Sequence, residues 1–134
     1  MPSLIEMAMR FLGTVYRDRI TGSPDALAGL FAHLLGHPRG CVFVAEVDGV
    51  ITGGICGHVF VHPMSGERVA SELGWWVEPH SRGPGIRLLK AFETWASVAG
   101  ASAIQMVAPN ARVAAFYARV GYEPIETTYQ RRVA

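Results

Sequence analysis

Charge, cysteine and long apolar runs are all scarce in this sequence. Only 17% of its 134 residues are charged and the net charge is +1, with the basic residues scattered along the chain. A concentrated basic surface for nucleic acid is therefore not expected. No apolar run approaches the roughly 20 residues that span a bilayer. The opening, "MPSLIEMAMRF", carries an acid where a signal peptide needs basic residues. These absences predict a soluble cytoplasmic protein that binds neither nucleic acid nor membrane.

The two cysteines, Cys41 and Cys56, are too few and too isolated for a disulfide framework or a CxxC metal site. They lie in apolar segments without a nearby histidine, which argues against a cysteine-linked acyl intermediate. His58 and His62 share one face of an expected strand, but no third ligand accompanies them. We therefore expect reduced thiols and no bound metal.

The chain is rich in apolar residues and in the residues that begin and end secondary structure. Half of it is apolar, which suffices for one domain over residues 1–134 with a sizeable core. Apolar residues at helical spacing predict helices near residues 3–17 and 24–35, and Ser23 is placed to cap the second. Asp48-Gly49 is a two-residue hairpin signal between two β-rich runs.

The rest of the chain alternates between strands and helices. We expect a third strand at 68–77, a helix at 85–99, a short strand at 102–108, a helix capped by Asn110 and a final strand over 123–133. The strands on either side of the 85–99 helix form one right-handed crossover unit with it. This order predicts an α/β fold in which helices cover a mixed sheet.

The segment "EPHSRGPGIRLLKAF", residues 78–92, looks least like ordinary packing. It joins the carboxyl end of an expected strand to the amino end of a helix, where open α/β sheets hold ligands and unpaired N–H groups attract anions. Gly83 and Gly85 permit close approach of a phosphate, and Arg82 and Arg87 offer charge-assisted contacts. A purely structural turn explains the same glycines as well. The segment fits neither GxxxxGK[ST] nor GxGxxG, so nucleotide hydrolysis and dinucleotide binding are not expected.

Three segments, in order, resemble the GNAT superfamily of acyl-CoA-dependent N-acyltransferases. "VEPHSRGPGIRLLKAFETWA" is similar to the family's motif A, V-x-P-x-x-[QR]-x-x-G-x-[GA]. "NARVAAFYARVGYEP" is similar to its second signature, N-x-x-A-x-x-x-Y-x-x-x-G-[FY], and "VFVAEVDGVITGGICG" resembles its second and third strands. The positions that match the two signatures are Val77, Pro79, Arg82, Gly85, Asn110, Tyr117, Gly121 and Tyr122. The resemblance covers about residues 41–133 and implies a GNAT-like fold, a mostly antiparallel mixed sheet flanked by about four helices.

Some positions depart from the family's pattern. Arg87 stands where the last glycine or alanine of motif A belongs, Val113 replaces a usual alanine, and Pro84 has no N–H to offer a phosphate oxygen. The family's usual first strand has no counterpart before the first helix. The departures keep a second function open, a non-catalytic acyl-CoA-binding or regulatory module. A third is a small interaction protein whose turn is only structural.

The resemblance implies an N-acetyltransferase that takes acetyl-CoA as the acyl donor and transfers the acetyl group directly to a primary amine in a ternary complex. No metal takes part in this chemistry. The residues expected to bind CoA are Arg82, Gly83, Gly85, Ile86 and Arg87 for the pyrophosphate, Trp76 and Val77 for the pantetheine arm through their backbone groups, and Asn110 for that arm or its loop.

Two residues are candidates for the proton transfers. An amine with a pKa of about 10.4 is mostly protonated at neutral pH, so a base assists its attack. Glu72, on the strand that would line the cleft, is the first candidate base, with Glu78 and His80 behind it. Tyr117 matches the family's tyrosine that protonates the leaving thiolate. Each has a structural alternative, because Glu72 also fits a solvent-facing strand position and Tyr117 also fits a core position on its helix.

For the acceptor, the first two helices and the last strands, which would build its pocket, carry no diagnostic residues. The resemblance implies a small-molecule or peptide amine, and it is compatible with a homodimer. Trp75 and Trp76 point to opposite faces of their strand, so we expect one in the core and the other as a wall of the acceptor site.

Overall fold

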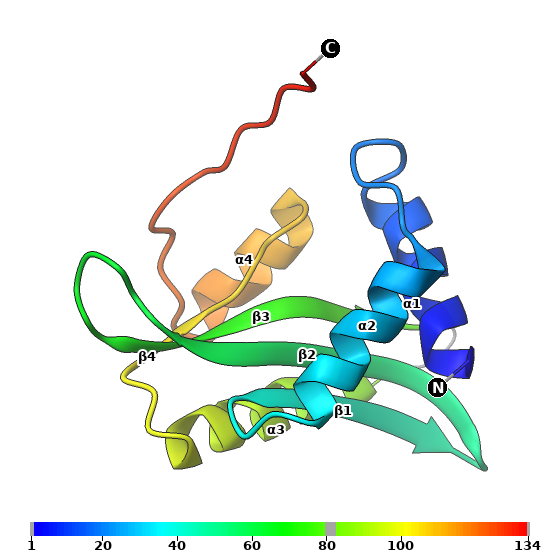
Figure 1. The fold of residues 1–134 in the computed structure, drawn as a ribbon, viewed down its shortest axis with the longest axis horizontal. Helices are drawn as coiled ribbons and strands as arrows, with labels where there is room; N and C mark the ends of the chain where they lie inside the picture. The colour runs from blue at the N-terminus through cyan, green and yellow to red at the C-terminus, as the bar shows by residue number, and fades with distance from the viewer. Residues whose placement is uncertain (1, 80–82, 134) are drawn as a thin grey trace.

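A computed structural model describes residues 2–79 and 83–133 of the chain. The helices and strands in these ranges are α1 (Pro2–Val15), α2 (Pro24–Leu35), β1 (Gly40–Val47), β2 (Val50–Val61), β3 (Arg68–Val77), α3 (Pro84–Val98), β4 (Ala103–Gln105) and α4 (Ala111–Arg119) (Figure 1). Up to the end of α4, this is the order expected from the sequence.

The strands form one mixed sheet in the order β1-β2-β3-β4. Neighbours are antiparallel except for β3 and β4, which are parallel. The parallel pairing runs only from Val69↔Ala103 to Ser71↔Gln105, whereas β3 continues to Val77. The expected α/β fold with a mostly antiparallel mixed sheet is confirmed. Because the pairing ends at Ser71 while β3 continues to Val77, the two strands separate and leave one edge of β3 without a partner strand.

Helices cover both faces of the sheet, and each face has its own apolar core (Figure 1). On one face, α1 and α2 pack through residues such as Leu4 and Phe31 against Trp76 of β3. On the other face, α3 packs through Phe92 and its neighbours, with Trp75 at the edge of the cluster. The two adjacent tryptophans thus lie on opposite faces of β3, as the alternation of a strand requires.

The local signals in the sequence are realised at α2 and at the first hairpin. The Ser23 side chain accepts a hydrogen bond from the backbone N–H of Ala26 at 3.2 Å, and Pro24 occupies the first turn. Asp48 and Gly49 both adopt positive φ, 51° and 80°, as a tight turn between antiparallel strands needs.

The expected final strand over 123–133 is wrong for this structure. The segment has no regular secondary structure, its side chains are exposed, and Figure 1 shows it leaving the sheet. A side-chain hydrogen bond of 2.9 Å links it to the body, from Arg132 Nη2 to the carbonyl of Arg19. A segment with the composition of a strand forms one only if it pairs with the edge strand of a sheet. Here the segment does not pair with β4. The strand expected at 102–108 is likewise shorter, because only Ala103–Gln105 pair with β3.

Candidate active site

The point where β3 and β4 separate is bridged by the two residues predicted to transfer protons. Val107 lies just beyond β4, and its backbone N–H donates to Glu72 Oε1 at 3.0 Å. Its carbonyl accepts a hydrogen bond from the Tyr117 hydroxyl, also at 3.0 Å. The structure therefore brings Glu72 of β3 and Tyr117 of α4 onto the backbone of a single residue.

Glu72 is buried rather than solvent-facing. Only 5% of its surface is exposed, and burial raises the pKa of its carboxyl to about 7, against the lowering effect of the bond from Val107. An irregularity in the strand accompanies this: Gly57 pairs with Glu72 and Cys56 with Gly74, which leaves Leu73 as an extra residue. Such a bulge re-aims the neighbouring side chains. A carboxyl with this pKa is partly ionised near neutral pH, which suits a general base.

Tyr117 is equally enclosed. It is 6% exposed, and its ring stacks on that of Trp75 at a centroid distance of 6.0 Å and an interplanar angle of 24°. Burial raises its pKa, and the nearby charge of Glu72 raises it further. Its hydroxyl thus stays protonated near neutral pH, as a proton donor must.

Tyr122 fixes the end of α4 beside Tyr117. The two rings lie 5.6 Å apart, and the Tyr122 hydroxyl donates to Glu93 Oε2 of α3 at 2.8 Å. Desolvation and this carboxylate raise the pKa of Tyr122. α3 and α4 are therefore tied together next to the two candidate catalytic residues.

The glycine-rich turn gives α3 an amino end without a side-chain cap. Gly83 has a φ of 96°, which favours glycine, and Pro84 follows it in the first turn. A Cβ added to Gly85 would lie 3.3 Å from Val77 Cγ2, so Gly85 lets the helix start close to β3. Ile86 and Arg87 are exposed in the first turn. The backbone N–H groups of such a turn point outward and can bind an anion. Arg82 and His80 lie outside the described residues.

The two predicted pantetheine contacts differ in the direction of their backbone groups. The N–H of Glu78 donates to the carbonyl of Thr52 on β2 at 2.8 Å. Alternate residues of a strand direct their backbone N–H and C=O groups to the same edge, so the backbone groups of Trp76, like those of Glu78, point towards β2. Trp75 and Val77 face the edge that β4 has left. Val77 and Trp75, rather than Trp76, therefore have backbone groups directed at the opening.

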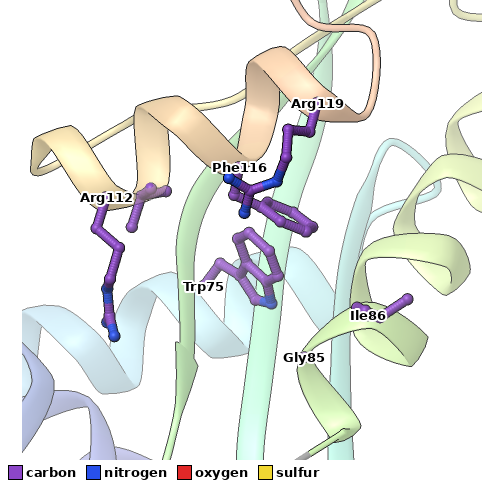
Figure 2. A pocket seen from close by; sticks show the side chains of 7 residues that line it. Trp75, Gly85, Ile86, Arg112, Phe116 and Arg119 are labelled. Carbon is purple, nitrogen blue, oxygen red and sulfur yellow. The ribbon is translucent and has the colours of Figure 1, made fainter.

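A cleft of about 320 Å³ adjoins this edge, between the start of α3 and α4. Its lining residues are Trp75, Gly85, Ile86, Arg112, Val113, Phe116 and Arg119, and Figure 2 shows Trp75 between the two helices. Three of these residues, Arg112, Phe116 and Arg119, were not predicted from the sequence as site residues. Their spacing of four and three residues places them on one face of a helix, and this was the only signal for them.

Asn110 begins α4. Its side-chain Oδ1 accepts a hydrogen bond from the backbone N–H of Val113 at 3.0 Å, the usual contact of an N-cap. This contact holds α4 in place beside the cleft.

The remaining candidates are less well placed. Glu78 forms an ion pair with Arg10 of α1 at 2.7 Å, so it is engaged away from Glu72. Burial raises the pKa of both cysteine thiols to about 12, and neutral thiols are poor nucleophiles. Within residues 2–79 and 83–133, no group of three potential metal ligands occurs and no helix is long and apolar enough to cross a membrane.

Several solved structures share this fold. The aminoglycoside N-acetyltransferase AAC(6')-Iy in complex with CoA aligns with a TM-score of 0.76 at 19% identity, over 98% of this chain and 88% of that one. An aminoglycoside acetyltransferase from an uncultured soil metagenomic sample gives 0.72 at 20% identity, over 99% and 88%. A transcriptional regulator from Bacillus halodurans C-125 gives 0.77 at 17% identity, over 96% and 93%. At these identities the likeness shows the fold alone.

The sequence itself carries the family assignment. No curated protein sequence matches this chain. The family model described as "Acetyltransferase (GNAT) family" matches residues 5–122, from α1 through α4 to Tyr122. The opening between β3 and β4, the glycine-rich start of α3 and the tyrosine of α4 all lie within the matched range. The chain belongs to the acetyltransferase (GNAT) family.

Proposed function

We propose that this protein transfers an acetyl group from acetyl-CoA to a primary amine by direct attack in a ternary complex. One observation carries the proposal: two groups bond to the backbone of the same residue, Val107. Glu72, with a pKa raised to about 7, accepts from its N–H, and the buried Tyr117 hydroxyl donates to its carbonyl. A base that is partly ionised and an acid that stays protonated are the two groups that amide formation from a thioester needs.

The reaction then follows from the two side chains. The Glu72 carboxylate takes one of the two protons that the acceptor ammonium loses and later releases it to solvent. The second proton leaves the nitrogen after the attack and passes to solvent, which reprotonates the Tyr117 oxygen. The amine nitrogen forms a bond to the thioester carbonyl carbon, and the carbon–sulfur bond breaks. The departing thiolate takes its proton from the Tyr117 hydroxyl, which is restored from solvent. Each proton moved is accounted for, and no covalent acyl-enzyme forms.

Acetyl-CoA would enter through the edge that β4 leaves open. The uncapped first turn of α3, with Gly83, Gly85, Ile86 and Arg87, would hold the pyrophosphate, together with Arg82, which comes just before it in the sequence. The outward backbone groups of Trp75 and Val77 would pair with the pantetheine amides. Backbone donors of this kind also polarise a thioester carbonyl.

The acceptor is a small-molecule or peptide amine. Two of the structures that share the fold are aminoglycoside acetyltransferases by name, which supports an amine as the acceptor class. Aminoglycosides therefore belong in the first acceptor panel, beside polyamines, amino acids and peptide N-termini.

A second function, an acyl-CoA-binding or regulatory module without turnover, is favoured by Pro84. This residue occupies the first turn of α3 and removes one N–H from the set that would hold the pyrophosphate. This alternative predicts binding of acetyl-CoA without release of free CoA in the presence of any amine of the panel.

The proposal is tested first by calorimetric titration with acetyl-CoA. We expect saturable binding that Arg82→Ala combined with Gly85→Ala weakens at least about tenfold, the loss of about 1.4 kcal/mol. Gly29→Ala is a matched control, since Gly29 lies in α2 and a Cβ there has open space. An absence of binding at millimolar acetyl-CoA would overturn the enzyme and the binding module alike.

Turnover is measured next as free thiol released with each acceptor. Release that requires an amine and is lost in Tyr117→Phe supports direct transfer. Binding without release across the panel would select the regulatory module instead.

A further inference from the structure

The cleft beside the open edge has a cationic wall that the proposed chemistry does not use. Arg112 and Arg119 both line it, seven residues apart on α4, and the same lining includes Gly85 and Ile86 at the start of α3. Figure 2 shows both guanidinium groups on the cleft side of α4, with Arg119 folded across Phe116. A cleft with two arginines on one wall and a helix amino end on the other fits a ligand with more than one anionic group.

Arg119 is held in this position by an aromatic ring. Its guanidinium carbon lies 5.9 Å from the centroid of the Phe116 ring, within the range of a cation–π contact. Phe116 in turn lies against Trp75, with ring centroids 6.0 Å apart. The Arg119 charge is thereby held against the wall of the cleft.

Within residues 2–79 and 83–133, no acidic side chain pairs with the two arginines of this wall. No acidic side chain is among the lining residues of the cleft. In the part of the chain that the structure describes, neither Arg112 nor Arg119 forms an ion pair, and the ion pair that does occur joins Arg10 to Glu78. The positive charge is thus available to a ligand, and arginine is the side chain best suited to bidentate contact with a phosphate.

We propose that Arg112 and Arg119 bind the 3′-phosphate of CoA and make the protein select CoA over its dephosphorylated form. This inference rests on the proposed function, because it assigns a second anion site in the cleft that acetyl-CoA would occupy. The pyrophosphate would be held at the amino end of α3, and the adenosine 3′-phosphate is the other anionic group of the same ligand. The two arginines across the cleft are its partners.

The test compares CoA with dephospho-CoA, which differ only in this phosphate, by calorimetry on the full chain. We expect the native protein to bind CoA more tightly than dephospho-CoA by at least about tenfold. Arg112→Gln and Arg119→Gln each reduce the CoA affinity severalfold and leave dephospho-CoA nearly unchanged, and the double variant brings the affinity ratio close to one. Arg119→Lys keeps the charge but loses the planar fork, so it restores part of the ratio.

Arg39→Gln is the matched control for net charge, because Arg39 is exposed in the loop between α2 and β1. It leaves the affinity ratio unchanged. Circular dichroism and thermal melting show whether each variant keeps the native fold.

The possible outcomes separate this inference from the proposed function. A native protein that binds neither ligand overturns the proposed function. Native binding of CoA with a ratio that survives the double substitution overturns the 3′-phosphate site alone. An equal loss of affinity for both ligands places the arginines on the pyrophosphate and also overturns it.

Discussion

At the scale of single residues, burial of the Glu72 carboxyl makes the stability of the fold depend on pH. Its pKa rises from an ordinary 4.5 to about 7 in the folded chain, so between these values the folded state binds more protons than the unfolded state. The free energy of unfolding therefore falls as the pH rises from about 4.5 to about 7, and the loss is complete above that range. The shift corresponds to a cost on the order of 3 kcal/mol at alkaline pH.

Replacing Glu72 with glutamine removes this cost. The amide oxygen still accepts the hydrogen bond from Val107, and no charge is buried. We expect Glu72→Gln to unfold like the native chain at pH 5 and to be more stable at pH 8, by on the order of 1–3 kcal/mol. Urea unfolding at the two pH values measures this, with the exposed Glu46→Gln as control. Parallel pH profiles for Glu72→Gln and native protein would contradict the assignment.

The same substitution is expected to reduce activity while it increases stability. If Glu72 is the base, it acts only when ionised, so we expect kcat/KM of the native protein for the amine to rise with pH through about 7. Glu72→Gln loses roughly a hundredfold or more in kcat and loses that limb of the profile. The readout is the pH profile of kcat/KM for one amine, measured at subsaturating amine concentrations, and retention of the limb would assign it to the acceptor amine instead.

For Tyr117, phenylalanine removes only the hydroxyl and its bond to the Val107 carbonyl. The lost hydrogen bond costs about 1 kcal/mol of stability. If Tyr117 is the acid, kcat falls on the order of a hundredfold while the dissociation constant of acetyl-CoA changes less than about threefold. A purely structural tyrosine would instead change binding and turnover together, or neither.

At the scale of elements, two helices begin with the same contact and differ in what they support. Ser23 of α2 and Asn110 of α4 each accept a hydrogen bond from the backbone N–H three residues on. Substitution of either by alanine costs about 1 kcal/mol of stability. Because α4 carries Tyr117 and one wall of the cleft, Asn110→Ala also weakens acetyl-CoA binding, whereas Ser23→Ala does not.

This pair is checked by thermal melting and by the acetyl-CoA titration on both variants. Ser23→Ala serves as the control for lost helix stability alone. Equal affinities for acetyl-CoA in the two variants would show that Asn110 contributes nothing beyond its cap.

Elements with a local cause were predictable from the sequence. The cap at Ser23, the Asp48-Gly49 turn and the opposite faces of Trp75 and Trp76 each follow from two to four neighbouring residues, and all three are confirmed. The strand expected over 123–133 failed because pairing depends on a partner edge, which composition does not specify.

At the scale of the whole molecule, one sheet separates two apolar cores, and the segment 123–133 packs into neither of them. Phe92 is completely buried under β2, where a Cβ on Gly57 would come within 2.5 Å of its ring. Phe92→Ala is expected to cost about 3–5 kcal/mol of unfolding free energy. Tyr129→Ala, in a side chain that is 89% exposed, is expected to change it by less than about 0.5 kcal/mol.

Denaturant unfolding of both variants measures these values. A large loss in Tyr129→Ala would show that the 123–133 segment packs against something in solution, for instance the sheet edge of a second copy.

The sequence predicted part of the site, Tyr117 through the family's second signature and Glu72 through its position on the strand expected to line the cleft. Glu72 and Tyr117 were both named from the sequence, but their shared contact with Val107 depends on the separation of β3 from β4 and on the bulge at Leu73. The only sequence signal for Arg112 and Arg119 is a spacing that places them on one face of a helix. Only the packing of α4 across the cleft places both of them in its lining.

The two adjacent tryptophans of β3 also give the molecule a built-in optical reporter. Trp75 stands in the wall of the cleft and stacks on Tyr117, whereas Trp76 packs against Phe11 under α1. Emission from Trp75 would therefore follow ligand entry, and emission from Trp76 would follow the loosening of the helical layer. With Trp95 and one of the pair replaced by phenylalanine, a single fluorophore distinguishes filling of the site from opening of the fold.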